Sequence, residues 1–176
     1  TRETHDVKIS NKERAEFATS KNADICVRIH ANGSDSSSTS GALALTPSSS
    51  NPYVANLAND SRKLSESVLN AYCQATGMAN QGVQANDTMT GINWSEVPVA
   101  ILELGFMSNP TEDAAMQDAT MQNNMVQGIA NGIDAYFGWK RWKSWTCERF
   151  RKSFWCSATK CWILPKRGYK KWQILI

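Results

Sequence analysis

Apolar and polar positions alternate with two different periods along the first 138 residues. From Ile25 to Ile29 every second residue is isoleucine or valine, a period of two that predicts a strand over residues 23–30. Residues 98–102 form a continuous apolar run, which is typical of a strand buried on both faces. A shorter apolar patch at residues 42–45 could form a brief strand within a polar loop.

A spacing of three or four residues between apolar positions predicts helices elsewhere. Ser10 and Glu13 have the spacing of a capping box, which predicts a helix that starts there and ends near Asn22. Apolar residues recur at helical spacing over residues 54–76, where Gly77 would end the helix, and again over residues 121–137.

The remaining segments are predicted from their turn chemistry. Asn109 is a good N-cap and Pro110 a good first helical residue, so a short helix to about residue 117 is expected after a turn that begins at Gly105. Residues 77–97 are polar and contain glycines, and we expect a loop there. Helices that alternate with strands predict an α/β domain, with an open, mostly parallel sheet flanked by helices.

Composition changes abruptly after Gly138. The chain carries a net charge of +3, but residues 139–176 carry +10 and residues 1–138 carry −7, and six of the seven tryptophans follow Gly138. We therefore treat residues 1–138 as the domain and residues 139–176 as a separate tail. No apolar run approaches the roughly 20 residues that a membrane-spanning helix needs.

Two interpretations of the tail remain open. Bases interleaved with tryptophans over residues 139–145 could bind an anionic membrane, teichoic acid or nucleic acid. The tail shows no repeat and little periodicity, however, and a coding frame lost after Gly138 would change the composition equally abruptly. We favour a disordered or frame-shifted tail over a binding function, and we expect no nucleic-acid partner.

His30 and Glu103 are the candidate chemical groups of the domain. Each ends a strand-like run, and sites in open α/β sheets gather outside the carboxyl ends of the strands. A histidine there can offer a neutral nitrogen to zinc, and a desolvated glutamate can transfer protons. A hydrogen-bonded structural histidine and a glutamate bonded to backbone N–H groups explain the same pattern, and the pattern alone favours these structural roles.

Four sequence blocks carry a resemblance to a known family. Residues 23–33, ADICVRIHANG, resemble the "AD…SIHAN" segment of zinc-dependent N-acetylmuramoyl-L-alanine amidases, and residues 97–110, VPVAILELGFMSNP, resemble their "PAVLVELGFLSN" segment. Residues 1–15 and 128–137 are similar to two further segments of that family, its "TR…D…RA" stretch and its last helix. The blocks keep the family's order, and the chain is identified as a member with a type 3 amidase catalytic domain.

The resemblance implies a bacterial peptidoglycan hydrolase that acts outside the cell or in the cell wall. It implies a zinc ion (Zn2+) held by two histidines and one glutamate, with water as the fourth ligand. His30 matches the second histidine, and Glu103 matches the catalytic glutamate. The implied reaction is hydrolysis of the amide between N-acetylmuramic acid and L-alanine by the zinc-activated water.

The chain departs from the family pattern at its start. The family's first histidine and its glutamate ligand lie upstream of the block that residues 1–2 match, so we expect both to be absent. We also expect the first strand and helix to be missing, and the chain to be inactive by itself. His5 is the other histidine of the chain, at a position where the family has no ligand.

Other residues near the matched segments carry lesser expectations. Arg28 stands where serine is commoner, and we expect a partly exposed strand residue, with pairing to a peptide-stem carboxylate as the alternative. Asn32 and Asn109 are expected to shape turns. Trp94 could be an aromatic residue that contacts glycan.

The alternative function is a non-catalytic cationic protein that binds cell wall or membrane through residues 139–176.

Overall fold

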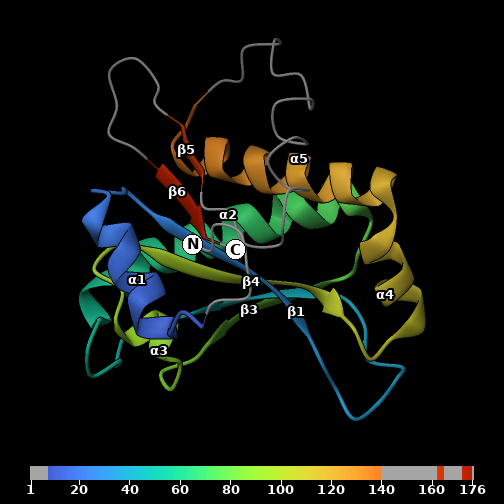
Figure 1. The fold of residues 1–176 in the computed structure, drawn as a ribbon, viewed down its shortest axis with the longest axis horizontal. Helices are drawn as coiled ribbons and strands as arrows, with labels where there is room; N and C mark the ends of the chain where they lie inside the picture. The colour runs from blue at the N-terminus through green and yellow to red at the C-terminus, as the bar shows by residue number, and fades with distance from the viewer. Residues whose placement is uncertain (1–7, 140–161, 165–171, 176) are drawn as a thin grey trace.

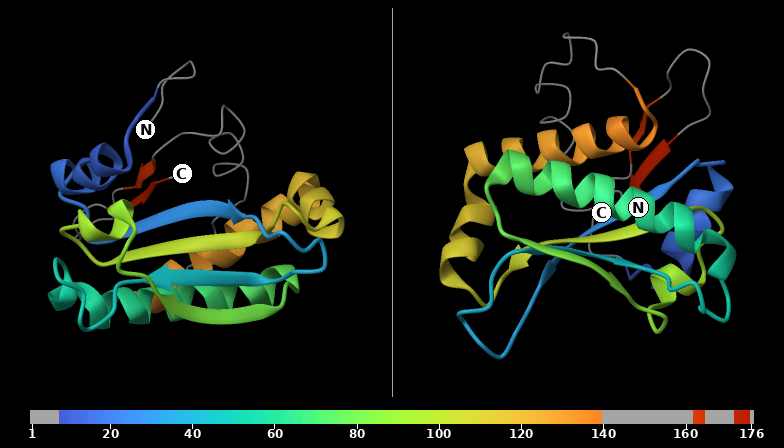
Figure 2. Two further views of the ribbon diagram at one scale, coloured as in Figure 1. Left: turned by 90° about the horizontal axis from the view of Figure 1, so that it is seen from below. Right: turned by 180° about the vertical axis from the view of Figure 1, so that it is seen from behind.

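In the computed structural model a single sheet lies between two layers of helices (Figures 1 and 2). The structure describes residues 8–139 and, for the backbone, residues 162–164 and 172–175. In chain order its elements are α1 (Asn11–Ser20), β1 (Cys26–Asn32), β2 (Ala42–Thr46), the 3-10 helix η1 (Ala55–Leu57), α2 (Ala58–Thr76), β3 (Asn80–Ala85), α3 (Thr90–Asn93), β4 (Val99–Phe106), α4 (Pro110–Gln117), α5 (Ala119–Tyr136), β5 (Trp162–Leu164) and β6 (Trp172–Leu175).

The sheet is open and mixed, with the strand order β3-β2-β4-β1-β6-β5. β1 is parallel to both β4 and β6, and β2 is parallel to β3, whereas the β2–β4 and β5–β6 pairs are antiparallel. The predicted α/β class, with a mostly parallel sheet flanked by helices, is therefore confirmed. The position beside β1, on the side away from β4, is taken by β6. The other expectations for residues 139–176 fall outside the described residues.

One face of the sheet packs against α2 and α5, which lie side by side across it (Figure 2, right). Ile25, just before β1, and Val27 and Ile29 within it alternate with a period of two. All three belong to the core of this layer, together with buried side chains of both helices. The buried residues that the two helices contribute are Leu64, Val68, Leu69, Tyr72, Met125, Ile129 and Ile133.

The opposite face packs against α1 and α3 (Figure 2, left). Because successive side chains of a strand point to opposite faces, this layer receives the other residues of β1 and β4, among them Cys26 and Ile101. Ala18 of α1 and Ile92 of α3 complete the core on this side. Cys26 is a small, fully buried residue of this layer.

Local sequence signals account for most helix ends. Ser10 and Glu13 form both hydrogen bonds of the predicted capping box, at 3.2 and 2.7 Å. Gly77 ends α2 in the left-handed conformation, with φ of 76°. Asn109 caps α4 as predicted, and Pro110 is the first residue of that helix.

The prediction of a loop over residues 77–97 is wrong. This segment contains the strand β3 and the short helix α3. β3 is an edge strand of polar and small residues, none of them buried, so it lacks the alternation that would reveal it. The turn predicted to begin at Gly105 is also too early, because β4 continues to Phe106, which pairs with Asn32.

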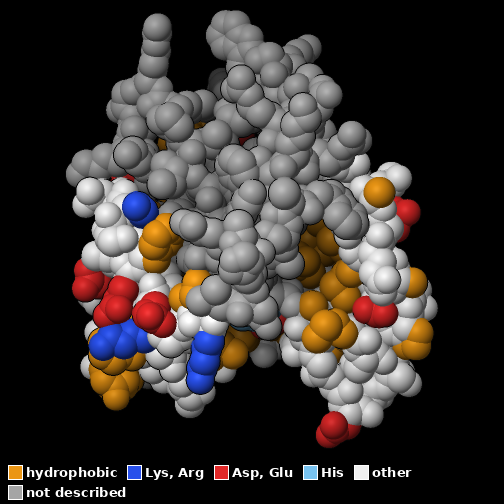
Figure 3. All heavy atoms as spheres, viewed as in Figure 1, with side chains coloured by type: hydrophobic (Ala, Val, Ile, Leu, Met, Phe, Trp, Pro, Cys, Tyr) orange, Lys and Arg blue, Asp and Glu red, His pale blue; other side chains and the backbone are white. Residues whose placement is uncertain are grey.

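The surface around α1 and α3 carries charges of both signs (Figure 3). Lys12 and Glu16 of α1 form an i,i+4 pair at 3.7 Å, and both side chains are largely exposed. Such exposed pairs contribute little to stability. Within the described residues, no helix combines the length and the apolar character that crossing a membrane requires.

Candidate active site

His30 and Glu103 lie side by side on neighbouring strands. In the parallel pairing of β1 with β4 their Cα atoms are direct partners. Residues paired in this way project to the same face of a sheet, so both side chains lie on the α1 and α3 side. Tertiary pairing thus places together two residues that are 73 positions apart in the sequence.

Glu103 is the more enclosed of the two. It is 7% exposed, and its Oε2 atom has no hydrogen-bond partner among the described residues. The prediction that Glu103 follows its strand is wrong, because it lies within β4, opposite Leu43 of β2. Desolvation raises the pKa of its carboxyl, and the nearby charge of Arg28 opposes that rise only in part. A carboxyl whose pKa is raised binds a proton more readily than an exposed glutamate does.

His30 lies at the rim of the same site, near the end of its strand as predicted. His30 is exposed to solvent, whereas the preceding residue, Ile29, is buried. Desolvation and then the positive charges of Arg28 and Arg14 lower the pKa of His30 to about 4. Both this value and the ordinary one leave the imidazole largely neutral at pH 7, the form in which histidine binds metal.

Arg28 is buried, which corrects the expectation of a partly exposed strand residue. It is 5% exposed, and its Nη2 donates a hydrogen bond of 2.8 Å to Oδ1 of Asn11 in α1. The guanidinium lies against Gly91 of α3, where an added Cβ would come within 1.8 Å of Nη1. Arg28 therefore occupies space that only a glycine at position 91 leaves open. Its positive charge acts on both His30 and Glu103.

A carboxylate that sequence reasoning missed holds the loop beside this site. Glu112 of α4 accepts hydrogen bonds from the backbone N–H groups of Gly41 at 2.6 Å and Phe106 at 2.8 Å. Asn109 donates from Nδ2 to the carbonyl of Thr39 at 3.2 Å. These bonds tie the loop before β2 to the end of β4. No local pattern reveals Glu112, because one partner, Gly41, is distant in the sequence and the other, Phe106, is the last residue of β4.

The described residues do not form a complete metal site. No group of three or more His, Cys, Asp or Glu side chains in the described part of the chain could hold a metal ion. His30 offers one neutral nitrogen, and the unpartnered Oε2 of Glu103 is the kind of atom that a metal or its ligand would engage. His5 lies outside the described residues. A zinc ion at this position would require ligands beyond those that the structure describes.

The raised pKa of Glu103 predicts how stability depends on pH. Burial favours the protonated form of the Glu103 carboxyl. The fold therefore has its full stability below the ordinary pKa of glutamate and loses part of it as the pH rises through the raised pKa of the folded state. Glu103→Gln, which stays neutral, should therefore stabilise the fold by about 1 kcal/mol at pH 8 and by little at pH 4. Urea unfolding at both pH values measures this, and an equal effect at both would contradict it.

Comparison with known proteins relates the chain to one family of enzymes. The profile of the N-acetylmuramoyl-L-alanine amidase family matches residues 1–135. The catalytic domain of CwlV, an N-acetylmuramoyl-L-alanine amidase from Bacillus (Paenibacillus) polymyxa var. colistinus, superposes with a TM-score of 0.62 at 31% identity. That match covers 77% of this chain and 69% of the CwlV domain.

Two curated relatives match in sequence. An uncharacterized cell wall amidase of Bacillus anthracis is 30% identical over 131 residues, which are 73% of this chain and 24% of the relative. The N-acetylmuramoyl-L-alanine amidase LytC of Bacillus subtilis is 26% identical over 134 residues, 76% of this chain and 26% of LytC. The chain thus spans about a quarter of the length of these relatives.

Proposed function

The chain belongs to the N-acetylmuramoyl-L-alanine amidase family, and from this premise we propose that it provides the acid/base and one metal ligand of a peptidoglycan hydrolase. The bond cleaved would be the amide between the lactyl group of N-acetylmuramic acid and L-alanine. The observation that carries the proposal is the pairing of His30 with Glu103 on one face of the sheet. The Bacillus anthracis relative is named a cell wall amidase, which supports action at the cell wall.

Glu103 is the residue to which we assign proton transfer. Amide hydrolysis adds a hydroxyl to the carbonyl carbon and needs a proton on the leaving nitrogen. Glu103 would accept a proton from the attacking water at Oε2 and then donate it to the nitrogen of L-alanine. A desolvated carboxyl suits both steps, because burial raises its pKa and makes it a stronger base than an exposed glutamate.

His30 is proposed to bind metal rather than to transfer protons. Its neutral imidazole at the open rim could coordinate an ion next to the carboxyl of Glu103. The family is generally zinc-dependent, and zinc bound here would supply a Lewis acid that polarises the scissile carbonyl and acidifies water. Because the described residues do not complete the coordination, the further ligands belong to parts of the protein that the structure does not describe.

Metal removal tests the proposal on the full gene product. Chelation should reduce the release of amino groups from purified peptidoglycan to background, and added Zn²⁺ should restore it. His30→Ala should lower both the bound zinc and the rate by more than about tenfold. Residues 1–176 alone should show no turnover, as the sequence analysis predicts. Unchanged activity after chelation, or full zinc content in His30→Ala, would refute the metal role.

A further inference from the structure

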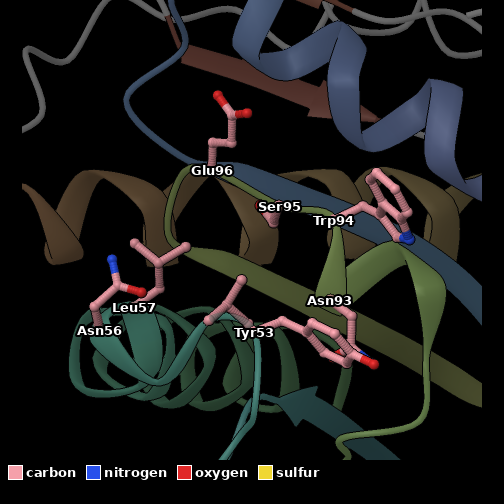
Figure 4. Close-up of a pocket in the computed structure, with 8 residues that line it drawn as sticks. Tyr53, Asn56, Leu57, Asn93, Trp94, Ser95 and Glu96 are labelled. Carbon is pink, nitrogen blue, oxygen red and sulfur yellow. The ribbon is translucent and has the colours of Figure 1, made fainter.

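A second candidate site lies at the end of the sheet opposite to His30 and Glu103. A pocket of about 340 Å³ opens between the segment that follows β2 and the segment that precedes β4 (Figure 4). Val99, where β4 begins, lies four positions before Glu103, which is about 13 Å of extended chain. The volume falls within the range of small-molecule binding sites.

Two aromatic side chains flank this pocket. Tyr53 is 70% exposed and Trp94 is 48% exposed, and both side chains line the pocket (Figure 4). Exposed apolar surface that is rimmed by polar residues marks ligand-binding grooves, whereas a single exposed apolar residue needs no explanation. Among the described residues just one other large hydrophobic side chain, Met107, is comparably exposed, at 57%, and it follows the far end of β4.

A buried asparagine links the two segments that carry the rings. Asn51, 3% exposed, accepts hydrogen bonds at Oδ1 from the backbone N–H groups of Tyr53 at 2.9 Å and Val54 at 3.0 Å. Its Nδ2 donates to Oδ1 of Asn93, the neighbour of Trp94, at 2.9 Å and to Asp87 at 2.8 Å. The two segments that carry the aromatic residues are therefore held by one hydrogen-bonded unit, which fixes the spacing of these segments before any ligand binds.

Two polar side chains on the rim are available to a ligand. Asn56 and Glu96 line the pocket, both are exposed, and no hydrogen bond within the described residues engages either side chain. Lys12 lies over the Trp94 ring at 3.8 Å from its centroid, which restrains the indole. Exposed rings beside free amide and carboxylate groups match the chemistry of a sugar, which has apolar C–H faces and hydroxyl and acetamido groups at its edge.

We propose that this pocket binds the glycan strand of peptidoglycan through its N-acetylated sugars. The rings of Tyr53 and Trp94 would pack on sugar faces, and Asn56 and Glu96 would bond hydroxyl or acetamido groups. The choice of an N-acetylated glycan rests on the proposed function. The carboxylate of Glu96 at the rim disfavours polyanions such as teichoic acid as the ligand. A second contact with the same strand would hold it on the enzyme while the amide bond is cleaved at the distant site.

Calorimetric titration with a β-1,4-linked tetramer of N-acetylglucosamine tests this site. Tyr53→Ala and Trp94→Ala should each weaken binding by about tenfold, whereas Trp94→Phe should recover part of the loss. Met107→Ala is the matched control, an equally exposed apolar side chain elsewhere, and should bind as the wild type does. Both rings are on the surface, so thermal unfolding of every variant should match the wild type. Absent binding, or equal weakening by Met107→Ala, would overturn the proposal.

The same titration separates this site from the proposed catalytic function. Glu103→Gln should bind the tetramer with unchanged affinity, because position 103 lies at the other end of β4. Binding without any amide cleavage by the full gene product would refute the hydrolase and leave the pocket standing. Cleavage without tetramer binding would refute the pocket and leave the hydrolase standing.

Discussion

Replacing Glu103 with glutamine is expected to slow amide cleavage by the full gene product by about 10²- to 10⁴-fold, the range that general acid–base catalysis contributes. Glutamine keeps the size of the side chain but cannot accept and return a proton at Oε2. Because Glu103 is buried, a water molecule cannot readily take over its role in proton transfer. Single-turnover rates on purified peptidoglycan measure the effect.

The matched control for this substitution is Glu66→Gln. Glu66 is a carboxylate on α2 that is 47% exposed and pairs with Arg62, so its loss should leave the rate unchanged. Zinc content distinguishes an acid/base from a metal ligand, and Glu103→Gln should retain the bound zinc of the wild type. A rate within a few-fold of the wild type, or zinc lost together with activity, would contradict the role assigned to Glu103.

Gly132→Ala is expected to destabilise the fold by about 3 kcal/mol, the largest stability effect that we predict for one added methyl group. A Cβ at this position of α5 would lie 2.5 Å from Cα of Val68 and 2.7 Å from the carbonyl oxygen of Ser67, both backbone atoms of α2. Alanine favours a helix over glycine by about 1 kcal/mol, but this gain is smaller than the steric cost. The helices would have to move apart and lose packing over the sheet.

Two further substitutions calibrate that result. Gly128 lies one turn earlier on α5, and its Cβ would meet Cα of Tyr72 at 2.8 Å, so Gly128→Ala should be destabilising as well. Gly33→Ala is the neutral control, because no atom lies within 4 Å of the added group. Urea unfolding of the three variants measures the order. A Gly132→Ala protein as stable as Gly33→Ala would show that α2 and α5 do not approach as closely as described.

Elements specified by local chemistry could be predicted from the sequence. The capping box at Ser10, the terminating Gly77 and the Asn109–Pro110 helix start each depend on contacts within a few residues, and the structure reproduces them. β3 could not be predicted, because its polar residues form a strand only through pairing with the edge of β2. Backbone pairing of this kind leaves no hydrophobic period in the sequence.

The candidate site was predictable only in part. Family resemblance singled out His30 and Glu103, but their side-by-side placement depends on the register between two strands that are far apart in the chain. The burial of Arg28 could not be read from a period of two, because α1 and α3 cover that face and Gly91 leaves room for the guanidinium. The aromatic pocket was anticipated only as a loop position at Trp94, and Tyr53 and the Asn51 network emerged from tertiary structure.

Mass spectrometry of peptidoglycan digested by the full gene product tests the central claim most directly. If the carboxyl of Glu103 and a metal bound beside His30 hydrolyse the muramoyl amide, the products are stem peptides with a free L-alanine amino group and glycan with an intact lactyl carboxyl. Stem peptides still joined to the lactyl group, with the cut instead in a glycosidic bond or within the peptide, would contradict it.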